Sequence, residues 1–543
     1  MAIADRLRAL FGRQSQPKTV ISVHRERQVA VCSILFFLLL GLPLWWSTTR
    51  VYRAELPTSD IVRFTPEQTL PVPVVFYIDA KTPLSQADAT FIETSVQAQV
   101  DSQRPQFTAS EWHIRYQAAV RVGVAPDTPG HYTLRLRMGS DITSVDVTPA
   151  RSAIVSVPHV AQAKDVLVKA ISAIVADEER SVRDLAPQAS KAIGNTHAVL
   201  KYAPEYAVTL TLLNENPVDG AAVDWDIKQA VRMYLQPLVD ELRPFTRLSV
   251  SSQVLHHAGP PPVTAHKADN GTYLTSDMLP HFVNSPSWNF ASVDPTSPML
   301  NFVLFVPALA SQPMRILDSG IERSSAFLVS QWGGVSIANL PDTTRPGDKV
   351  VLSPEDMQKH MGYFISQIRS LVGIRSNAPL ASSAQLQVRV RPATATGVSG
   401  WEVDALMRRW LVRNRQTAIA TLQSLVRLVD SLQNMVVMDD IKEKVDRSLA
   451  ALYETENALR RLPDLNYVHA FASAASAASL AESAFFDPSM VSMLYFPDQH
   501  KYAIYMPFFL PATLPLLAAL KKIFAERRRV RAAASVKESS KTD

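Results

Sequence analysis

Two long apolar runs without a charged residue lie near the ends of this chain. Val29–Trp46 reads VAVCSILFFLLLGLPLWW and has 18 residues, and Tyr502–Leu520 reads YAIYMPFFLPATLPLLAAL and has 19. About 20 apolar residues in a helix cross the hydrocarbon core of a bilayer. The pattern therefore predicts two transmembrane helices, at 29–49 and 502–520. A cleaved signal peptide is the alternative for the first run, but a Trp-Trp pair stands where a small-residue cleavage site is needed.

Three prolines divide the second apolar run. Pro507, Pro511 and Pro515 recur every four residues, so they share one face of a helix. Each proline frees a backbone carbonyl, and inside lipid that carbonyl needs a neighbour or a local distortion. We expect this face to pack against other transmembrane helices. A tolerated irregularity of the helix is the alternative.

Between these runs, strand-like and helix-like patterns follow one another in the order β-α-β-β-β-α, and this order occurs twice. Strands are read from continuous or alternating apolar residues, and helices from apolar residues three and four positions apart. The sequence therefore predicts an α/β fold with two modules, at 50–200 and 201–398. The predicted elements are Leu70–Ala80, Leu84–Val100, Trp112–Val124, His131–Met138, Ala153–Val157 and Ala161–Ala186, then Tyr206–Leu213, Asp224–Leu242, Leu248–His257, Leu300–Val306, Phe327–Ala338 and Pro354–Val372.

Local signals mark the ends of two of these helices. Asp224 is expected to cap the helix at 224–242, and Pro237 is expected to kink it. Ser353 and Asp356 form a capping-box variant, and Gly373 gives a C-terminal stop. Trp332-Gly333-Gly334 is either a site of close backbone approach or a bulge or turn within a strand.

The remaining segments read as a loop and a helical layer. Residues 256–298 carry several Pro, Asn, Asp and Ser residues and read as a long loop. From Trp401 to Leu462 there is neither Gly nor Pro, and apolar residues step by three and four. This predicts a long helical hairpin interrupted at Met438-Asp439-Asp440. Leu465–Phe486 reads as an Ala/Ser-rich helix. The helical region is therefore expected over 399–501.

The charge pattern predicts a membrane topology. The chain has 543 residues and a formal charge of +5, from 55 Lys+Arg against 50 Asp+Glu. The tails at 1–28 and 521–543 hold 6 and 8 basic residues but only 2 and 3 acidic ones, so the part between them is net acidic. Basic tails flank membrane spans on the cytoplasmic side. Both termini are therefore expected to be cytoplasmic and the large domain lumenal, and nucleic-acid binding has no support.

Asn270-Gly271-Thr272 is the only Asn-x-Ser/Thr sequence in the chain. On the lumenal side, Asn270 is a candidate glycan acceptor. The alternative is an unused Asn-Gly turn.

Known catalytic patterns are missing from the sequence. The single cysteine, Cys32, lies inside the first apolar run, and no G-x-S-x-G, P-loop, G-x-G-x-x-G or H-E-x-x-H motif occurs. His256-His257 with His266 is the tightest histidine cluster, and a solvated loop is favoured over a metal site there. Asp439-Asp440 reads as a cap or turn pair. We therefore expect no catalytic residue, no metal and no cofactor, although folding could still assemble a carboxylate pair.

Several blocks of sequence resemble the PIG-S family. They span nearly the whole chain in order, and none is a generic motif; the likeness is weaker from about Thr58 to Leu200. The blocks are GLPLWWSTTRVYRAELP (Gly41–Pro57), VDWDIKQAVRMYLQPLVDEL (Val223–Leu242), SVSSQVLHHA (Ser249–Ala258), PMLNFVLFVPALA (Pro298–Ala310), WGGVSIANL (Trp332–Leu340), SLVGI (Ser370–Ile374) and ESAFFDPSMVSMLYFPDQHKYAIYMPFFLPATLPLL (Glu482–Leu517).

The resemblance implies a non-catalytic scaffolding subunit of the GPI transamidase complex in the endoplasmic reticulum membrane. That complex removes a C-terminal signal from a precursor and joins the new carboxyl end to a GPI lipid. The catalytic cysteine–histidine dyad belongs to the PIG-K subunit in this family. PIG-K, PIG-T, PIG-U and a GPAA-type subunit are the expected partners, together with membrane lipid and GPI itself. The alternatives are a stand-alone membrane-anchored lumenal hydrolase and a lumenal receptor for lipid or signal peptide.

Overall fold

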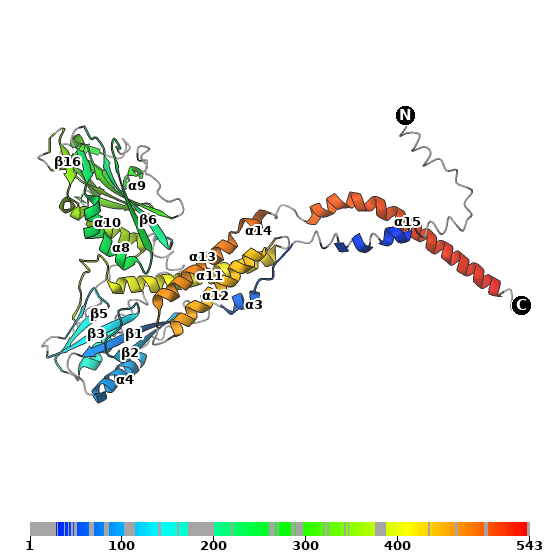
Figure 1. The fold of residues 1–543 in the computed structure, drawn as a ribbon, viewed down its shortest axis with the longest axis horizontal. Coiled ribbons are helices and arrows are strands. Elements are labelled where there is room, and N and C mark those ends of the chain that lie inside the picture. The colour runs from blue at the N-terminus through cyan, green and yellow to red at the C-terminus, as the bar shows by residue number, and fades with distance from the viewer. Residues whose placement is uncertain are drawn as a thin grey trace. The chain divides into compact units, whose positions relative to one another are not determined.

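The computed structural model (Figure 1) describes most of the chain from residue 52 to residue 539. Between residues 29 and 47 it describes 29, 31–36, 39–41, 43–44 and 47. Two compact units are present. The large unit comprises Ser59–Thr421 and Arg447–Ala481; the small unit comprises Leu422–Asp446, Glu482–Asp543 and the segment up to Thr58. The gaps after residue 52 are 65–69, 81–85, 103–113, 140–142, 160–161, 172–199, 219–220, 260–265, 269–270, 284–287, 289–296, 319–320, 323–324, 342–343, 346, 375–386, 433–434, 462–464 and 493–497.

The first sheet of the large unit has six strands, of which only one neighbouring pair is antiparallel. Its strands are β1 (Leu70–Ala80), β2 (Ile114–Val122), β3 (His131–Met138), β4 (Ser144–Val147), β5 (Ser152–Val157) and β17 (Gln387–Val390). The spatial order is β17-β4-β5-β3-β1-β2, and β4 runs antiparallel to β5. The helices α3 (Thr58–Arg63) and α4 (Gln86–Ser102) flank β1 in sequence, and residues 162–171 are helical after β5.

The second sheet repeats this plan in five strands. They are β6 (Glu205–Asn214), β8 (Arg247–Leu255), β11 (Met299–Val306), β14 (Ala326–Val329) and β15 (Gly333–Ile337). The order β14-β15-β11-β6-β8 matches β4-β5-β3-β1-β2 strand for strand. β14 is antiparallel to β15, as β4 is to β5, but β14 is an edge strand whereas β4 is covered by β17. Each sheet contains an antiparallel strand that the sequence did not predict as a separate element: β4 was missed, and β14 was merged with β15.

Two prolines in β1 are accommodated because of where β3 begins. Val75 donates its amide to Gly130, so the odd-numbered residues of β1 face β3. Pro71 and Pro73 share that parity, but pairing with β3 starts only at Val75. Their missing amides therefore break no ladder hydrogen bond. The carbonyl of Pro73, which β3 does not reach, instead accepts a buried hydrogen bond from the Tyr467 hydroxyl.

The central strand β11 is buried on both faces. Phe302 and Leu304 belong to an apolar cluster that also includes residues of the first sheet, α10 (Pro354–Val372) and α11 (Gly400–Ser431). Val303 and Phe305 point into a second cluster on the opposite face, which contains Phe282 of α9 (Leu279–Phe282). This double burial explains the continuous apolar run from which the strand was predicted.

Three predictions at element boundaries need correction. The segment 256–298, predicted as a loop, contains β9 (His266–Ala268), β10 (Gly271–Thr275) and α9, and β10 pairs with β12 (Met314–Asp318), itself beside β13 (Ile321–Glu322). Strands of three to five residues carry too little periodicity to be recognised.

Phe327–Ala338 is not one strand but the hairpin β14–β15.

The predicted helix at 224–242 begins later and is divided. Asp224 lies in β7 (Ala221–Trp225), which pairs with β16 (Lys349–Leu352), and Asp226 is the cap, accepting from the Gln229 amide. The helix then consists of α7 (Ile227–Ala230), a π turn (Val231–Leu235) and α8 (Gln236–Leu242). Pro237 stands in the first turn of α8, directly after the π turn, where a missing amide is tolerated. A short 3₁₀ turn, Leu309–Ser311, follows β11.

The capping of α10 agrees with the prediction. The Ser353 hydroxyl accepts from the Asp356 amide, and the Asp356 carboxylate accepts from the Ser353 amide. Gly373 ends the helix with a left-handed φ of 88°. Both signals depend only on residues close in sequence, so they can be recognised without knowledge of the tertiary structure.

The predicted helical hairpin is present as α11 followed by α12 (Asp439–Arg460). The break covers 432–438, so it lies earlier than the predicted Met438-Asp439-Asp440: only Met438 falls in it, and Asp439 begins α12. The Ala/Ser-rich helix is α13 (Tyr467–Phe485), followed by α14 (Pro488–Ser492) and α15 (Asp498–Ser539). In the large unit, the Ser448 hydroxyl of α12 donates to the Ala477 carbonyl of α13 at 2.8 Å. Close approach of this kind needs the small side chains that the sequence supplies.

Buried charges tie α11 to the rest of the large unit. Asp404, whose side chain is 0% exposed, accepts two 2.9 Å hydrogen bonds from Arg151 and a third from the Gly130 amide at 3.1 Å. Glu402 forms a two-bond pair with Arg369 of α10, at 2.7 and 3.2 Å. Arg415 reaches Glu456 of α12 at 2.7 Å. One helix is therefore bonded to the first sheet, to the helix of the second sheet and to its hairpin partner.

We predict that Asp404→Asn destabilises the large unit far more than Asp240→Asn does. The first change removes the buried countercharge of Arg151 and leaves only Asp127, whose side chain is 90% exposed, at a cost of about 3–5 kcal/mol in the free energy of unfolding. Asp240 pairs with Arg243 on the surface, where both side chains are more than half exposed, so its loss should cost at most about 1 kcal/mol. Urea denaturation followed by tryptophan fluorescence measures both. Equal destabilisation would contradict the role given to Asp404.

Candidate functional site

The histidines and paired aspartates singled out by the sequence do not form a catalytic group. His256 and His257 follow β8 and are exposed, and His266 is the first residue of β9. Within the described residues, no three His, Cys, Asp or Glu side chains lie together as metal ligands. Asp439 and Asp440 form the first turn of α12. The aspartates therefore lie at a helix start, as expected, whereas His266 lies in a strand and not in the predicted loop.

Among the described residues, a serine–histidine pair joins β15 to α10. The Ser336 hydroxyl lies 2.7 Å from Nδ1 of His360. Burial, aided by the charge of Lys359, lowers the pKa of His360 to about 4, so the ring is neutral and can act as an acceptor. Ser336 is 0% exposed, however, and a nucleophile must be reached by its substrate. In this structure the pair joins a strand to its covering helix.

The Trp332-Gly333-Gly334 sequence is explained by close backbone approach at the start of β15. A side chain at Gly333, whose φ is 143°, would overlap the backbone of Asn301 on β11. One at Gly334 would overlap the side-chain amide of Gln367 on α10. The two glycines therefore allow the strand and the helix to pack tightly.

A cluster of polar contacts in the small unit joins the segment after the first apolar run to the segment before the second. We call it the stem junction: Tyr52–Ala54, Val437, Asp439, Asp440, Lys444 and Asp487. The backbone of Tyr52–Ala54 exchanges two hydrogen bonds with Val437, of 2.9 and 3.3 Å, and the Tyr52 hydroxyl donates to Asp439 at 2.8 Å. Arg53 also donates to the carbonyl of Val429.

Lys444 completes the stem junction from the other side. Its ammonium group lies 2.7 Å from Asp440 and 2.8 Å from Asp487. Asp487 also accepts from the amide and hydroxyl of Ser489, and the hydrogen bonds from Lys444 and Ser489 lower its pKa to about 2. Both segments are therefore held at the same end of the α11–α12 hairpin by contacts within one unit.

The second apolar run lies in α15, and Pro507, Pro511 and Pro515 are all inside this helix and exposed. Exposed apolar residues accompany them, including Met506, Leu510 and Leu514. Among the described residues, no helix meets both the length and the hydropathy required of a membrane span. Asn270 falls outside the described residues; Thr272, two positions on, is buried in β10.

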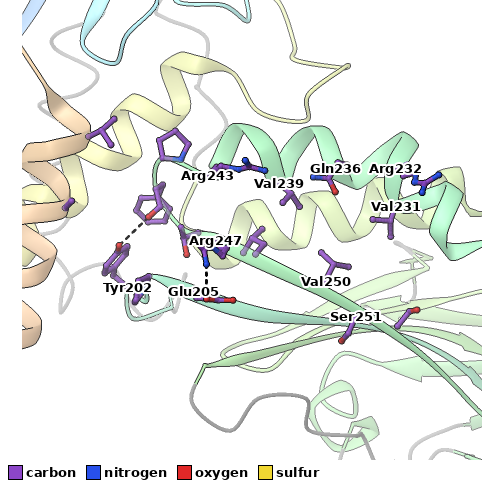
Figure 2. Close-up of a pocket in the computed structure, with 18 of the residues that line it drawn as sticks. Tyr202, Glu205, Val231, Arg232, Gln236, Val239, Arg243, Arg247, Val250 and Ser251 are labelled. Atoms are coloured by element: carbon purple, nitrogen blue, oxygen red, sulfur yellow. Dashed lines mark hydrogen bonds and ion pairs between the residues drawn. The ribbon is translucent and has the colours of Figure 1, made fainter.

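The large unit carries a groove of about 1160 Å³ along β8 (Figure 2). We call it the β8 groove; it lies between β8, the α7–α8 helical segment and α13. Val231 and Val239 line it from the helical segment, Val250 from the strand and Phe471 from α13. Burial raises the pKa of Tyr202, at one end, to about 12, so its hydroxyl stays neutral. Nothing in the sequence pattern indicated this groove, because its walls come from segments more than 200 residues apart.

A family model described as "Phosphatidylinositol-glycan biosynthesis class S protein" matches residues 32–530. The chain belongs to the PIG-S family. This agrees with the resemblance read from the sequence blocks, and it extends through 58–200, where those blocks are sparse.

Relatives of this PIG-S chain match it over nearly their full length. The protein named "GPI-anchor transamidase component PIGS" from Bos taurus is 30% identical over 568 residues, covering 97% of this chain and 99% of the relative. The Homo sapiens protein of the same name is 30% identical over 581 residues with the same coverage. A Schizosaccharomyces pombe protein named "GPI transamidase component PIG-S homolog" is 26% identical over 504 residues, covering 89% and 81%.

We predict that His360 makes the stability of this PIG-S chain pH-dependent between about pH 6.5 and 4. The folded state holds the ring neutral, with a pKa of about 4, while the unfolded chain binds a proton near 6.5. The stabilisation is therefore complete above pH 6.5 and is lost as the pH falls, by at most about 1.4 kcal/mol per unit. His360→Asn, which keeps an acceptor near Ser336, should flatten this profile in urea titrations at pH 7, 6 and 5. Parallel profiles for the two proteins would refute the assignment.

Proposed function

We propose that this PIG-S chain is a component of the GPI-anchor transamidase, required for attaching GPI to the carboxyl ends of precursor proteins in the endoplasmic reticulum. The observation that carries the proposal is the extent of the match: 97% of this chain aligns with 99% of relatives that bear that name.

We further propose that the chain is a non-catalytic scaffold. Its only cysteine lies in the first apolar run, and the described serine–histidine pair is buried. The thiolate chemistry then belongs to PIG-K, and this chain holds PIG-K, PIG-T, PIG-U and the GPAA-type subunit in place. The buried ion pairs of α11 support this role, because they join two sheets and a helical hairpin into one rigid binding body.

The proposed topology has two spans, at 29–49 and 502–520, with cytoplasmic tails and a lumenal body between them. The basic tails support this orientation. The stem junction supports an arrangement in which both spans begin close together, because it holds the segments that adjoin them. Pro507, Pro511 and Pro515 then face partner helices near the lipid substrate, since the carbonyls they free need partners inside the membrane.

Replacement of the three prolines tests the scaffold. P507A/P511A/P515A should preserve the lumenal body but reduce recovery of the other subunits in detergent, together with surface display of a GPI-anchored reporter in cells lacking the native chain. Ser336→Ala should leave both unchanged, because the hydroxyl is buried. Loss of reporter display by Ser336→Ala with an intact complex would favour a hydrolase. Activity of the chain alone, or crosslinking to precursor without other subunits, would favour the two alternative functions.

Asn270 is proposed to carry a glycan, which also makes it a marker of lumenal orientation. In the sequence, Asn270 directly precedes the first residue of β10. Glycosidase treatment should increase the gel mobility of the wild-type chain, and Asn270→Gln should have the faster mobility without treatment. If the wild-type and variant chains migrate together, Asn270 is an unused turn.

A further inference from the structure

The strand β8 ends the second sheet with a free edge. Arg247 donates its amide to Pro204, so the odd-numbered residues of β8 face β6, and their even-numbered neighbours point their backbone groups outward. Leu248, Val250, Ser252 and Val254 therefore offer four amides and four carbonyls along this edge. Among the residues that the structure describes, no strand pairs with it.

This edge lacks the usual protection. Edge strands of soluble folds are commonly shielded by lysines, prolines, bulges or a covering segment. β8 reads RLSVSSQVL, with its one charge at the first residue and no bulge in its nine-residue register with β6. In the first sheet, β2 holds the equivalent position, and there Gln97 of α4 accepts a hydrogen bond from the outward amide of Val120 at 2.9 Å. The edge strand of the first sheet is therefore covered by α4, whereas no described segment covers the equivalent edge strand of the second sheet, β8.

The β8 groove adds apolar contacts and positive charge beside this edge (Figure 2). Lys228, Arg232, Arg243 and Arg247 line it, against a single acidic residue, Glu205. Arg247 pairs weakly with Glu205 at 4.0 Å, and Arg243 pairs with Asp240 at 3.0 Å. Lys228 and Arg232, both exposed, have no ion pair among the described residues. The groove therefore suits a chain that carries carboxylates.

We propose that β8 and its groove receive an extended, acidic segment of a stably bound partner subunit, which adds a strand to the second sheet. Strand addition supplies main-chain hydrogen bonds, and Val231, Val239 and Val250 would contact alternate side chains of the guest. A stable subunit fits better than a passing precursor, because an unprotected nine-residue edge would be open to aggregation between reaction cycles. The proposal rests on membership of the chain in a multisubunit complex.

A photo-crosslinker placed at Ser252 in the full complex tests the identity of the guest. Ser252 is exposed, and its backbone amide and carbonyl point away from β6. Leu328, also exposed, lies on β14 at the opposite edge of the same sheet. Ser252 should crosslink to one subunit, and mass spectrometry should map the adduct to an extended segment rich in Asp and Glu. A crosslink to the same segment from Leu328, or a crosslink from Ser252 to precursor alone, would overturn the proposal.

Two proline variants separate strand addition from folding. Ser252→Pro removes an outward amide that β6 does not use, so thermal stability should persist while the Ser252-proximal subunit is recovered about tenfold less. Ser251→Pro removes an amide bonded to β6 and should lower stability itself. Lys228→Glu with Arg232→Glu should likewise reduce recovery of that subunit without unfolding the chain. Unchanged recovery with Ser252→Pro would refute the docking site; a wild-type chain that recovers no subunit would instead refute the proposed function.

Discussion

The contact between Asp404 and Arg151 is the constraint on which the large unit depends. A carboxylate that is fully removed from water is stable only if its hydrogen-bonding capacity is used, and here Arg151 and the Gly130 amide use it. Burial alone would lower the pKa of Arg151, but the hydrogen bonds from its guanidinium to Asp404 outweigh this and raise it. The Arg151 guanidinium therefore stays charged at any physiological pH.

The aromatic contacts around this pair define where α11 can lie. Trp401 stacks on Tyr132 of β3 with ring centroids 4.1 Å apart, and Arg408 lies over the rings of both Tyr132 and Tyr467 at 5.6 Å. Ionic and cation–π contacts are directional, in contrast to the apolar core around them. They fix the register of a 32-residue helix that could otherwise slide along an apolar surface.

The sequence predicts the elements that depend on neighbouring residues, and it misses the features that depend on contacts between distant segments. β1, β3 and α10 are recognisable because long apolar runs, a capping box and a C-terminal glycine act over a few residues. The short strands β9 and β10 are not, since their stability comes from each other and from β12. The partner of Asp404 lies 253 residues away, and the β8 groove depends on α13 meeting α8. Among the candidate functional features, the three prolines of α15 and Asn270 can be identified from the sequence alone. The stem junction and the open edge of β8 can be identified only from the folded structure.

The stem junction also sets an order of events in time. Tyr52 and Asp439 are separated by 387 residues, so the segment that follows the first apolar run is synthesised long before its partner exists. At translation rates of about 5–20 residues per second, that wait is roughly 20–80 s. Both sheets are synthesised in this interval, while the early stem has no hairpin to bind. The contact between Tyr52 and Asp439 can therefore form only after the strands of both sheets have been synthesised.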